Sequence, residues 1–252
     1  MRKLTFRMAM ALSALGLLVL AANIATEVRA QPPAVDPSAT QILQRMTANL
    51  SNLQEFSVHT QNNLEDELDS GHRVDFDISA DVIISRPNKL RAERKGDLID
   101  QAFYYDGKTL TLYNPSDKVY ATEPAPKTIE EMLDFARESL GLMVPVADLV
   151  YRNAFPLLMQ DVTLAVVVGK SVISGVRCDH LLFSRPGVDF QVWVADSGQP
   201  LPYKYVVTDT GFPSRLSIST VMSDWNVSPS AADSRFTFVP PEGAESISFM
   251  PL

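Results

Sequence analysis

The sequence predicts a mainly β protein with a smaller share of helix, and the spacing of its apolar residues is the reason. Residues 73–85 alternate between apolar and polar side chains through six repeats, which is typical of an antiparallel strand with one dry and one solvated face. Similar short runs, separated by turn residues, recur along most of the chain. Only residues 36–53 and 128–159 have apolar side chains at helical spacing. We therefore expect an antiparallel sheet of roughly ten or eleven strands with two helical regions.

The first 30 residues have the parts of a secretory signal peptide. Three basic residues are followed by an apolar run at 8–22 and by a small-residue site before Gln31. The apolar run is shorter than the roughly 20 residues of a membrane span. We therefore expect residues 1–30 to be a cleaved signal peptide of an exported protein, with an uncleaved anchor as the alternative.

Charge and cysteine content narrow the classes of partner and fold. Removing residues 1–30 takes away four basic residues and one acidic residue, which changes the formal charge from −8 to −11. Nucleic acids and anionic lipid headgroups are bound through basic patches, so this charge argues against both as partners. Cys178 is the only cysteine of the sequence, which excludes an internal disulfide. With no long linker, residues 31–252 are expected to form a single domain around an apolar core.

The expected elements follow in order along the chain. Asp36 as N-cap and Pro37 at the first position begin a helix that ends near Leu53. Asp106-Gly107 is a favoured tight-turn pair and predicts a hairpin at 103–113. The other expected strands are 56–64, 74–84, 89–93, 119–122, 162–168, 175–183, 188–194, 203–208, 214–226 and 236–239.

The helical region at 128–159 differs from its strand-rich surroundings. Thr128 with Glu131 is a capping-box signature, and Gly141 is a suitable C-cap. Pro145 fits the first turn of a second helix. The region has more apolar side chains than one buried stripe needs. We therefore expect it to lie across the open face of a curved sheet, partly as a lid; two ordinary core helices are the alternative.

Motifs for catalysis, nucleotides and metals are incomplete. Gly169-Lys170-Ser171 resembles the end of a phosphate-binding loop, but Leu164 stands where that loop needs a glycine. Cys178 and His180 share one face of a strand, yet a buried thiol beside a hydrogen-bonded histidine is the simpler interpretation. The three histidines are scattered along the sequence. We therefore expect no cofactor, no metal, no nucleotide and no enzymatic activity.

Several motifs, taken in their order, carry a family resemblance over most of residues 38–250. They are Arg86-Pro87-x-Lys89-Leu90-Arg91, Tyr105-Asp106-Gly107-Lys108-Thr109-Leu110, Tyr120-Ala121, Gly175-Val176-x-Cys178-Asp179-His180-Leu181 and Phe236-x-Phe238-x-Pro240-Pro241. With the apolar leader and the first helix, they resemble a family of predicted periplasmic proteins that is similar to the LolA/LolB-type lipoprotein carriers. More distantly, the chain is similar to LppX and to the sensor domain of RseB.

This resemblance implies a fold, a location and a function. The implied fold is a strongly curved antiparallel sheet that forms an incomplete, half-open β-barrel, covered by an N-terminal helix and by the mid-chain helical lid. The implied location is the periplasm. In carriers of that type the cavity holds acyl chains and the lid moves, and Arg86 matches an arginine that lies near the lid. The strand with Cys178 and His180 departs from the carrier pattern.

Two functions are the leading hypotheses, and an enzyme that relies on Cys178 and His180 alone comes third. The first is a carrier that binds a lipid or acyl chain, because an apolar pocket is the default binding site of such a fold. The second is a non-catalytic sensor or interaction module whose own side chains fill the cavity, with an outer-membrane or periplasmic protein as its partner. The expected cavity residues on strands are Phe76, Ile78, Val82, Leu90, Leu110, Leu112, Val192 and Val194, and those on the lid are Met132, Leu133, Phe135, Leu140, Met143 and Leu149.

Overall fold

The computed structural model describes residues 34–97, 99–142, 144 and 146–249. The expected signal peptide at 1–30 lies outside this range, as do Met143 and Pro145. Within it, no helix is long and apolar enough to cross a membrane.

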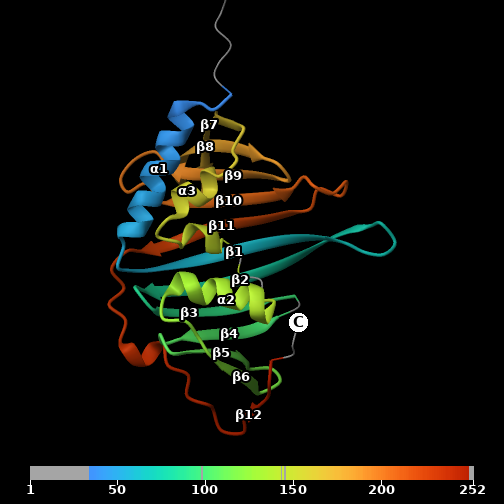
Figure 1. The fold of residues 1–252 in the computed structure, drawn as a ribbon, viewed down its shortest axis with the longest axis vertical. Coiled ribbons are helices and arrows are strands. Elements are labelled where there is room, and N and C mark those ends of the chain that lie inside the picture. The colour runs from blue at the N-terminus through green and yellow to red at the C-terminus, as the bar shows by residue number, and fades with distance from the viewer. Residues whose placement is uncertain (1–33, 98, 143, 145, 250–252) are drawn as a thin grey trace, which may run out of the picture. The chain divides into compact units, whose positions relative to one another are not determined.

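The described chain forms one sheet of 12 strands (Figure 1). Its order is β12-β6-β5-β4-β3-β2-β1-β11-β10-β9-β8-β7. Neighbours pair antiparallel, except that β12 pairs parallel with β6. β12 and β7 are the two ends, so the sheet of the described chain is not closed into a barrel. The strands are β1 (Glu55–Glu67), β2 (Arg73–Ser85), β3 (Lys89–Gly96), β4 (Asp100–Tyr105), β5 (Thr109–Asn114), β6 (Val119–Pro124), β7 (Leu164–Ile173), β8 (Val176–Arg185), β9 (Val188–Ala195), β10 (Pro202–Asp209), β11 (Ser217–Asn226) and β12 (Glu245–Ser246).

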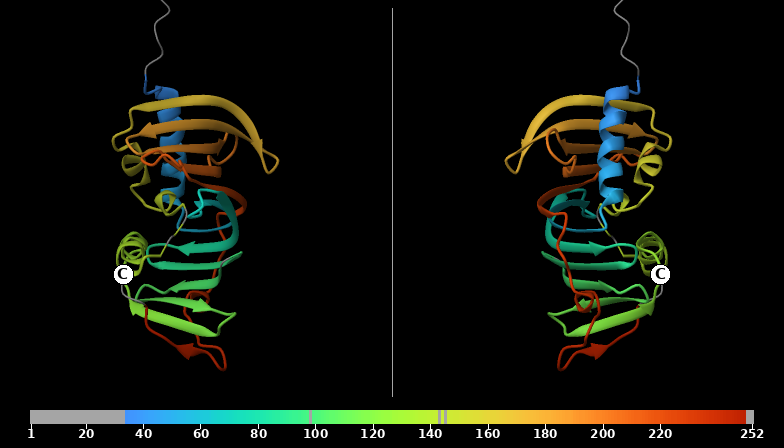
Figure 2. Two further views of the ribbon diagram at one scale, coloured as in Figure 1. Left: turned by 90° about the vertical axis from the view of Figure 1, so that its right-hand side faces the viewer. Right: turned by 90° about the vertical axis from the view of Figure 1, so that its left-hand side faces the viewer.

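Strand β1 joins two meanders into this sheet. Strands β1 to β6 are consecutive neighbours, and so are β7 to β11. β11 then pairs with β1, which brings the two ends of the domain together. Figure 2 shows the strands curving so that all the longer helices lie on one side. We call the side with the helices the inner face and the other side the outer face.

Strand β2 has the alternation that the sequence predicts. Ile78 and Ile84 are buried on the inner face, whereas Asp77 and Asp81 are exposed on the outer face. Ile83 is the exception, because it lies on the outer face and is still only 5% exposed. Most of this strand therefore has one buried and one exposed face, but near Ile83 both faces are covered.

Helix α1 (Pro37–Asn52) begins and lies as its apolar spacing predicts. The Asp36 side chain accepts a hydrogen bond from the backbone N–H of Ser38 at 2.8 Å, which caps the helix. Its buried residues Leu43 and Met46 are fully enclosed. The helix packs on β7, on β9 and on α3 (Ala154–Met159), so it fills the inner face of that half of the sheet.

The mid-chain helical region is broken more often than the sequence suggests. Helix α2 (Ile129–Leu140) has the expected cap, with the backbone N–H of Glu131 donating to the Thr128 hydroxyl at 3.3 Å. Gly141 ends it in the left-handed conformation, at φ 62°. The expected second helix is instead the three-residue turn η1 (Ala147–Leu149), followed by the short α3. Val146 has φ 57°, and a left-handed residue cannot continue a right-handed helix.

Residues 227–249, which we call the C-terminal segment, run along the outer face (Figure 2). The strand expected at 236–239 was a wrong prediction, because these residues form no strand. The following Pro240 and Pro241 have no N–H to donate to a ladder, which disfavours pairing there. Instead the Phe238 ring packs among the rings of Tyr104, Tyr113 and Tyr120, at centroid distances of 5.2, 5.3 and 5.1 Å.

Candidate functional site

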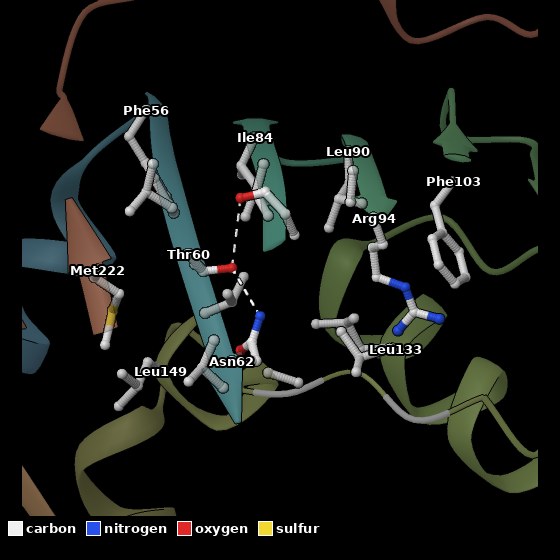
Figure 3. A pocket seen from close by; sticks show the side chains of 18 of the residues that line it. Phe56, Thr60, Asn62, Ile84, Leu90, Arg94, Phe103, Leu133, Leu149 and Met222 are labelled. Atoms are coloured by element: carbon white, nitrogen blue, oxygen red, sulfur yellow. Dashed lines mark hydrogen bonds between the residues drawn. The ribbon is translucent and has the colours of Figure 1, made fainter. Parts of the chain in front are cut away.

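An apolar cavity of about 100 Å³ lies between the inner face of the sheet and the elements α2 and η1 (Figure 3). Met132, Leu133 and Leu149 face it from the helical side, and side chains of β1 to β5 form its floor. A wider hollow of about 440 Å³ lies beside it, towards β10 and β11. Leu133, Val146 and Ala147 border both spaces, so they stand in the wall between them.

Cross-strand pairing arranges the cavity floor in rows. The first row is Phe56, Ile84, Leu90 and Tyr105. The second row is Val58, Val82, Ala92 and Phe103, and the third is Thr60, Ala80, Arg94 and Gln101. Side chains on one face are two residues apart, so neighbouring rows are separated by about 7 Å. The floor is apolar in the first two rows and becomes partly polar in the third.

A buried polar network crosses the floor where β1 meets β11. The Thr220 hydroxyl donates to Oδ1 of Asn62 at 2.7 Å. Nδ2 of Asn62 donates to the Thr60 hydroxyl at 3.1 Å and to the Ile78 carbonyl at 3.0 Å. Burying an amide without partners would cost free energy, and these bonds offset that cost. The network therefore fixes the register of the central strand pair.

Arg94 is the one charged side chain on the wall of this apolar cavity, among the described residues. Its Nη2 donates to Oε1 of Gln101 at 2.5 Å, and its guanidinium lies 4.6 Å from the ring centre of Phe103. Burial lowers the pKa of Arg94 to about 10. The guanidinium therefore keeps its positive charge at neutral pH, and its side chain is only partly exposed.

Arg86 connects the sheet to both ends of the region above the cavity. Its Nη1 donates to Oε1 of Glu130 in the first turn of α2 at 3.2 Å, and its Nη2 donates to the carbonyl of Val150 just after η1. The Arg86 side chain is 1% exposed. Burial lowers the pKa of Arg86, and the Glu130 carboxylate opposes that shift. The contact expected between Arg86 and the helical region is thus present in the structure.

The structure places half of the expected cavity residues on the cavity wall. These are Ile78, Val82, Leu90, Leu110, Met132, Leu133 and Leu149. Four of them lie on the inner face of β2, β3 or β5. The other three lie on the side of α2 and η1 that faces the sheet. Periodicity within each element was enough to select them.

The other expected residues lie elsewhere, and Met143 is outside the described residues. Val192 and Val194 are fully buried, but α1 fills the space above their strand. Phe135 is only half-buried, because the buried face of α2 passes through Met132 and Ala136 instead. The expected residues absent from the cavity wall are Phe76, Leu112, Phe135, Leu140, Val192 and Val194.

Several wall residues were not expected from the sequence. Phe56 and Val58 alternate clearly on β1, but only the pairing with β2 shows that they face the same space. Met222 and Trp225 come from β11, which is far away in sequence. Arg94 follows Leu90 and Ala92 at two-residue spacing, and this alternation was the signal that could have placed it.

Cys178 and His180 each have other partners. The Cys178 thiol is buried and lies 3.5 Å from the carbonyl oxygen of Val176, and burial raises its pKa to about 11. Nε2 of His180 is 2.8 Å from Oε1 of Gln191, and its ring stacks on Trp193 with a centroid distance of 4.0 Å. A thiol that stays protonated at neutral pH is a poor nucleophile. Nothing about this pair favours catalysis.

Comparison with known proteins gives a family and a fold. Residues 39–250 match a family model described as "Predicted periplasmic protein (DUF2092)". No curated protein matches the chain at a significant level.

Three solved structures are similar to this chain. LprF from Mycobacterium bovis has 14% identity and a TM-score of 0.50, over 85% of this chain and 100% of that chain. Lipoprotein LppX from Mycobacterium tuberculosis has 16% identity and a TM-score of 0.44, over 76% of this chain and 96% of that chain. A LolA superfamily protein from Nitrosomonas europaea has 14% identity and a TM-score of 0.38, over 79% of this chain and 97% of that chain.

Proposed function

The chain belongs to the DUF2092 family of predicted periplasmic proteins, and on that basis we propose that it carries the apolar chain of a lipid or an acylated ligand. The protein is periplasmic, as its motifs predicted. The observation that supports the proposal most is the apolar cavity under α2 and η1. Burying an acyl chain there would stabilise the complex by about 0.8 kcal/mol per methylene. An outer-membrane or periplasmic protein is the proposed recipient, and no catalytic step is proposed.

Uptake of a chain requires α2 and η1 to move. The cavity holds about 100 Å³, which is below the roughly 300–1,000 Å³ of ligand pockets. Leu133 and Ala147 separate it from the neighbouring hollow of about 440 Å³. We propose that outward movement of α2 and η1 joins the two spaces, so that these elements act as the lid.

Arg86 is proposed to set how readily this lid opens. It holds the first turn of α2 through Glu130 and the residue after η1 through the Val150 carbonyl. Both contacts converge on one buried guanidinium, next to the backbone bond that the Ile129 N–H donates to the Pro87 carbonyl at 3.0 Å. Breaking the two Arg86 contacts would loosen both ends of the lid together.

The small volume also favours a second candidate, a sensor or interaction module whose cavity is filled by its own side chains. In that case α2 and η1 would be ordinary core elements. Apolar ligands would then find no space, and a protein partner would bind the outside of the domain. The two candidates therefore differ in whether an apolar probe enters the cavity.

The first experiment measures binding of a neutral apolar fluorophore, N-phenyl-1-naphthylamine, and its displacement by dodecanol. Ala80 is 5% exposed on the cavity floor, so Ala80→Phe should fill the space and weaken probe binding by roughly tenfold or more. Ser79→Phe is the matched control, because the next side chain on β2 points to the outer face. It should bind the probe as the wild type does.

Mass spectrometry of protein gently extracted from the periplasm complements this test. A carrier should retain lipid, and the same spectra should show a mature chain that begins at Gln31 if residues 1–30 are removed. Wild-type protein that neither enhances probe fluorescence nor carries lipid would exclude the carrier and leave the interaction module. Equal probe binding by Ala80→Phe and the wild type would place the probe outside the cavity.

A further inference from the structure

We infer that the ligand of this cavity is an acyl chain with an anionic headgroup, and that Arg94 is the residue that recognises the headgroup. The inference rests on the proposed carrier function and adds the class of ligand and its direction in the cavity. It follows from the order of the rows on the floor and from the chemistry of the third row (Figure 3).

The cavity has one closed apolar end. In the first row, Phe56 and Leu90 are 3% and 7% exposed. The ring of Trp225 packs on Phe56 with a centroid distance of 5.8 Å. The Tyr105 hydroxyl donates to the Pro126 carbonyl at 2.6 Å, which satisfies the only polar group of that row. This end therefore suits the terminal methyl of a chain and offers nothing to a polar group.

The opposite end is where the wall becomes polar. Along β3 the inner-face side chains are Leu90, Ala92 and then Arg94, whose side chain is partly exposed while the first two are buried. Thr60 stands in the same row as Arg94, and its hydroxyl accepts a hydrogen bond from Asn62 within the wall. An amphiphile would match this gradient with its tail in the first row and its headgroup in the third.

The distance between these rows suits a medium-length chain. The first and third rows are separated by four residues, or about 13 Å of strand. A dodecyl chain can cover this length. A ligand that enters tail first therefore fills the apolar rows and leaves its headgroup beside Arg94.

Arg94 is suited to an anion rather than to a neutral headgroup. Its guanidinium is oriented from two sides, by the bond to Gln101 and by the ring of Phe103. A planar guanidinium binds the two oxygens of a carboxylate or phosphate in a fixed geometry, and charged hydrogen bonds of this kind are stronger than neutral ones. Because Arg94 is only partly buried, part of its side chain stays in contact with solvent.

The acidic net charge of the chain does not oppose this arrangement. A formal charge of −8 argues against attachment to an anionic lipid surface, which needs many basic contacts. Exposed charges are screened beyond about 8 Å at physiological salt, whereas contact with a partly buried guanidinium is screened much less. One headgroup inside the cavity can therefore bind where a membrane surface does not.

The test compares headgroups on the same chain length at pH 8, each below its micellar concentration. Displacement of N-phenyl-1-naphthylamine is measured with dodecanoate, dodecyl phosphate and dodecanol. We expect the wild type to bind dodecanoate at least roughly tenfold more tightly than dodecanol, because of the charged hydrogen bonds. Dodecyl phosphate shows whether the preferred anion is a carboxylate or a phosphate.

Three variants assign the preference to Arg94. Arg94→Met should lose the preference for dodecanoate over dodecanol, while its affinity for dodecanol stays within about twofold of the wild type. Arg94→Lys should keep part of this preference. Arg91→Met is the matched control, since Arg91 lies on the same strand but donates to the Arg235 carbonyl of the C-terminal segment on the outer face. It should retain the full preference for dodecanoate.

The outcomes separate this inference from the proposed function. Equal affinity of the wild type for dodecanoate and dodecanol overturns the inference but leaves the proposed carrier function standing. An Arg94→Met variant that keeps the preference for dodecanoate has the same consequence. Wild-type protein that binds neither ligand nor probe overturns both. If Arg94→Met fails to fold, the wild-type comparison and Arg94→Lys still decide the matter.

Discussion

At the scale of single residues, Arg86 is predicted to contribute strongly to stability. Its guanidinium is buried and holds Glu130 and the Val150 carbonyl. Arg86→Met removes one partner of a buried ion pair and leaves a carbonyl without its donor. We expect the free energy of unfolding to fall by about 3 kcal/mol, as for other buried pairs that lose one member. Urea denaturation followed by circular dichroism measures this change.

Arg177→Met is the matched control for that prediction. Arg177 also forms an ion pair, with Asp196 at 3.1 Å, but its side chain is 67% exposed. Exposed pairs contribute at most about 1 kcal/mol, so this variant should stay close to the wild type. If the two variants lose the same free energy of unfolding, burial does not explain how much Arg86 contributes to stability.

At the scale of elements, the cap of α2 is predicted to influence how often the proposed lid opens. The Thr128 hydroxyl accepts from the backbone N–H of Glu131. Thr128→Ala should cost about 1 kcal/mol and loosen the first turn of the helix. We expect hydrogen exchange of α2 amides to rise roughly fivefold, with exchange in β2 unchanged, and we expect faster association of N-phenyl-1-naphthylamine.

The N-cap of the other long helix provides the comparison. Asp36→Ala removes the cap of α1, which lies over the other half of the sheet. It should loosen α1 without changing the rate at which the probe associates. Faster association in this variant as well would mean that general loosening, and not opening of α2, admits the probe.

At the scale of the whole molecule, the sheet is supported on both faces by different parts of the chain. Helices cover the inner face, and the C-terminal segment covers part of the outer face (Figure 2). Phe236 in that segment is 1% exposed, so Phe236→Ala should lower the free energy of unfolding by roughly 3–4 kcal/mol. Val239→Ala is the control, because Val239 is 77% exposed and should change stability by less than about 0.5 kcal/mol.

Probe binding should distinguish the two faces. Folded Phe236→Ala protein should bind N-phenyl-1-naphthylamine within about twofold of the wild type, since the cavity lies on the inner face. A large loss of binding in a variant that remains folded would show that the C-terminal segment shapes the cavity through the sheet.

The sequence was most informative where a local rule decides the structure. The caps at Asp36 and Thr128 and the alternation of β2 were predictable because each depends on neighbours in sequence. The division of the second helix was missed, since Val146 adopts a positive φ that no pattern signals. The strand expected at 236–239 failed because the Phe236 and Phe238 side chains pack on the outer face.

The site was predictable only in part, because a cavity depends on which strands become neighbours. Residues of β2 and α2 were found from their own periodicity. Val192 and Val194 have an equally apolar pattern, but α1 occupies the space in front of them. The alternation along β3 places Arg94 on the face of Leu90 and Ala92, but only the pairing with β2 and β4 shows which residues stand beside it.

The pairing of β1 with β11 has a consequence for the order in which the chain can fold. Asn62 and Thr220, which bond across this pair, are 158 positions apart in the sequence. A polypeptide that is synthesised and exported from its N-terminus presents the β1–β6 meander well before β11 arrives. During that interval one edge of β1 has no partner and the apolar rows beside it face water. Nascent chains stalled before residue 217 are therefore the species most in need of a chaperone.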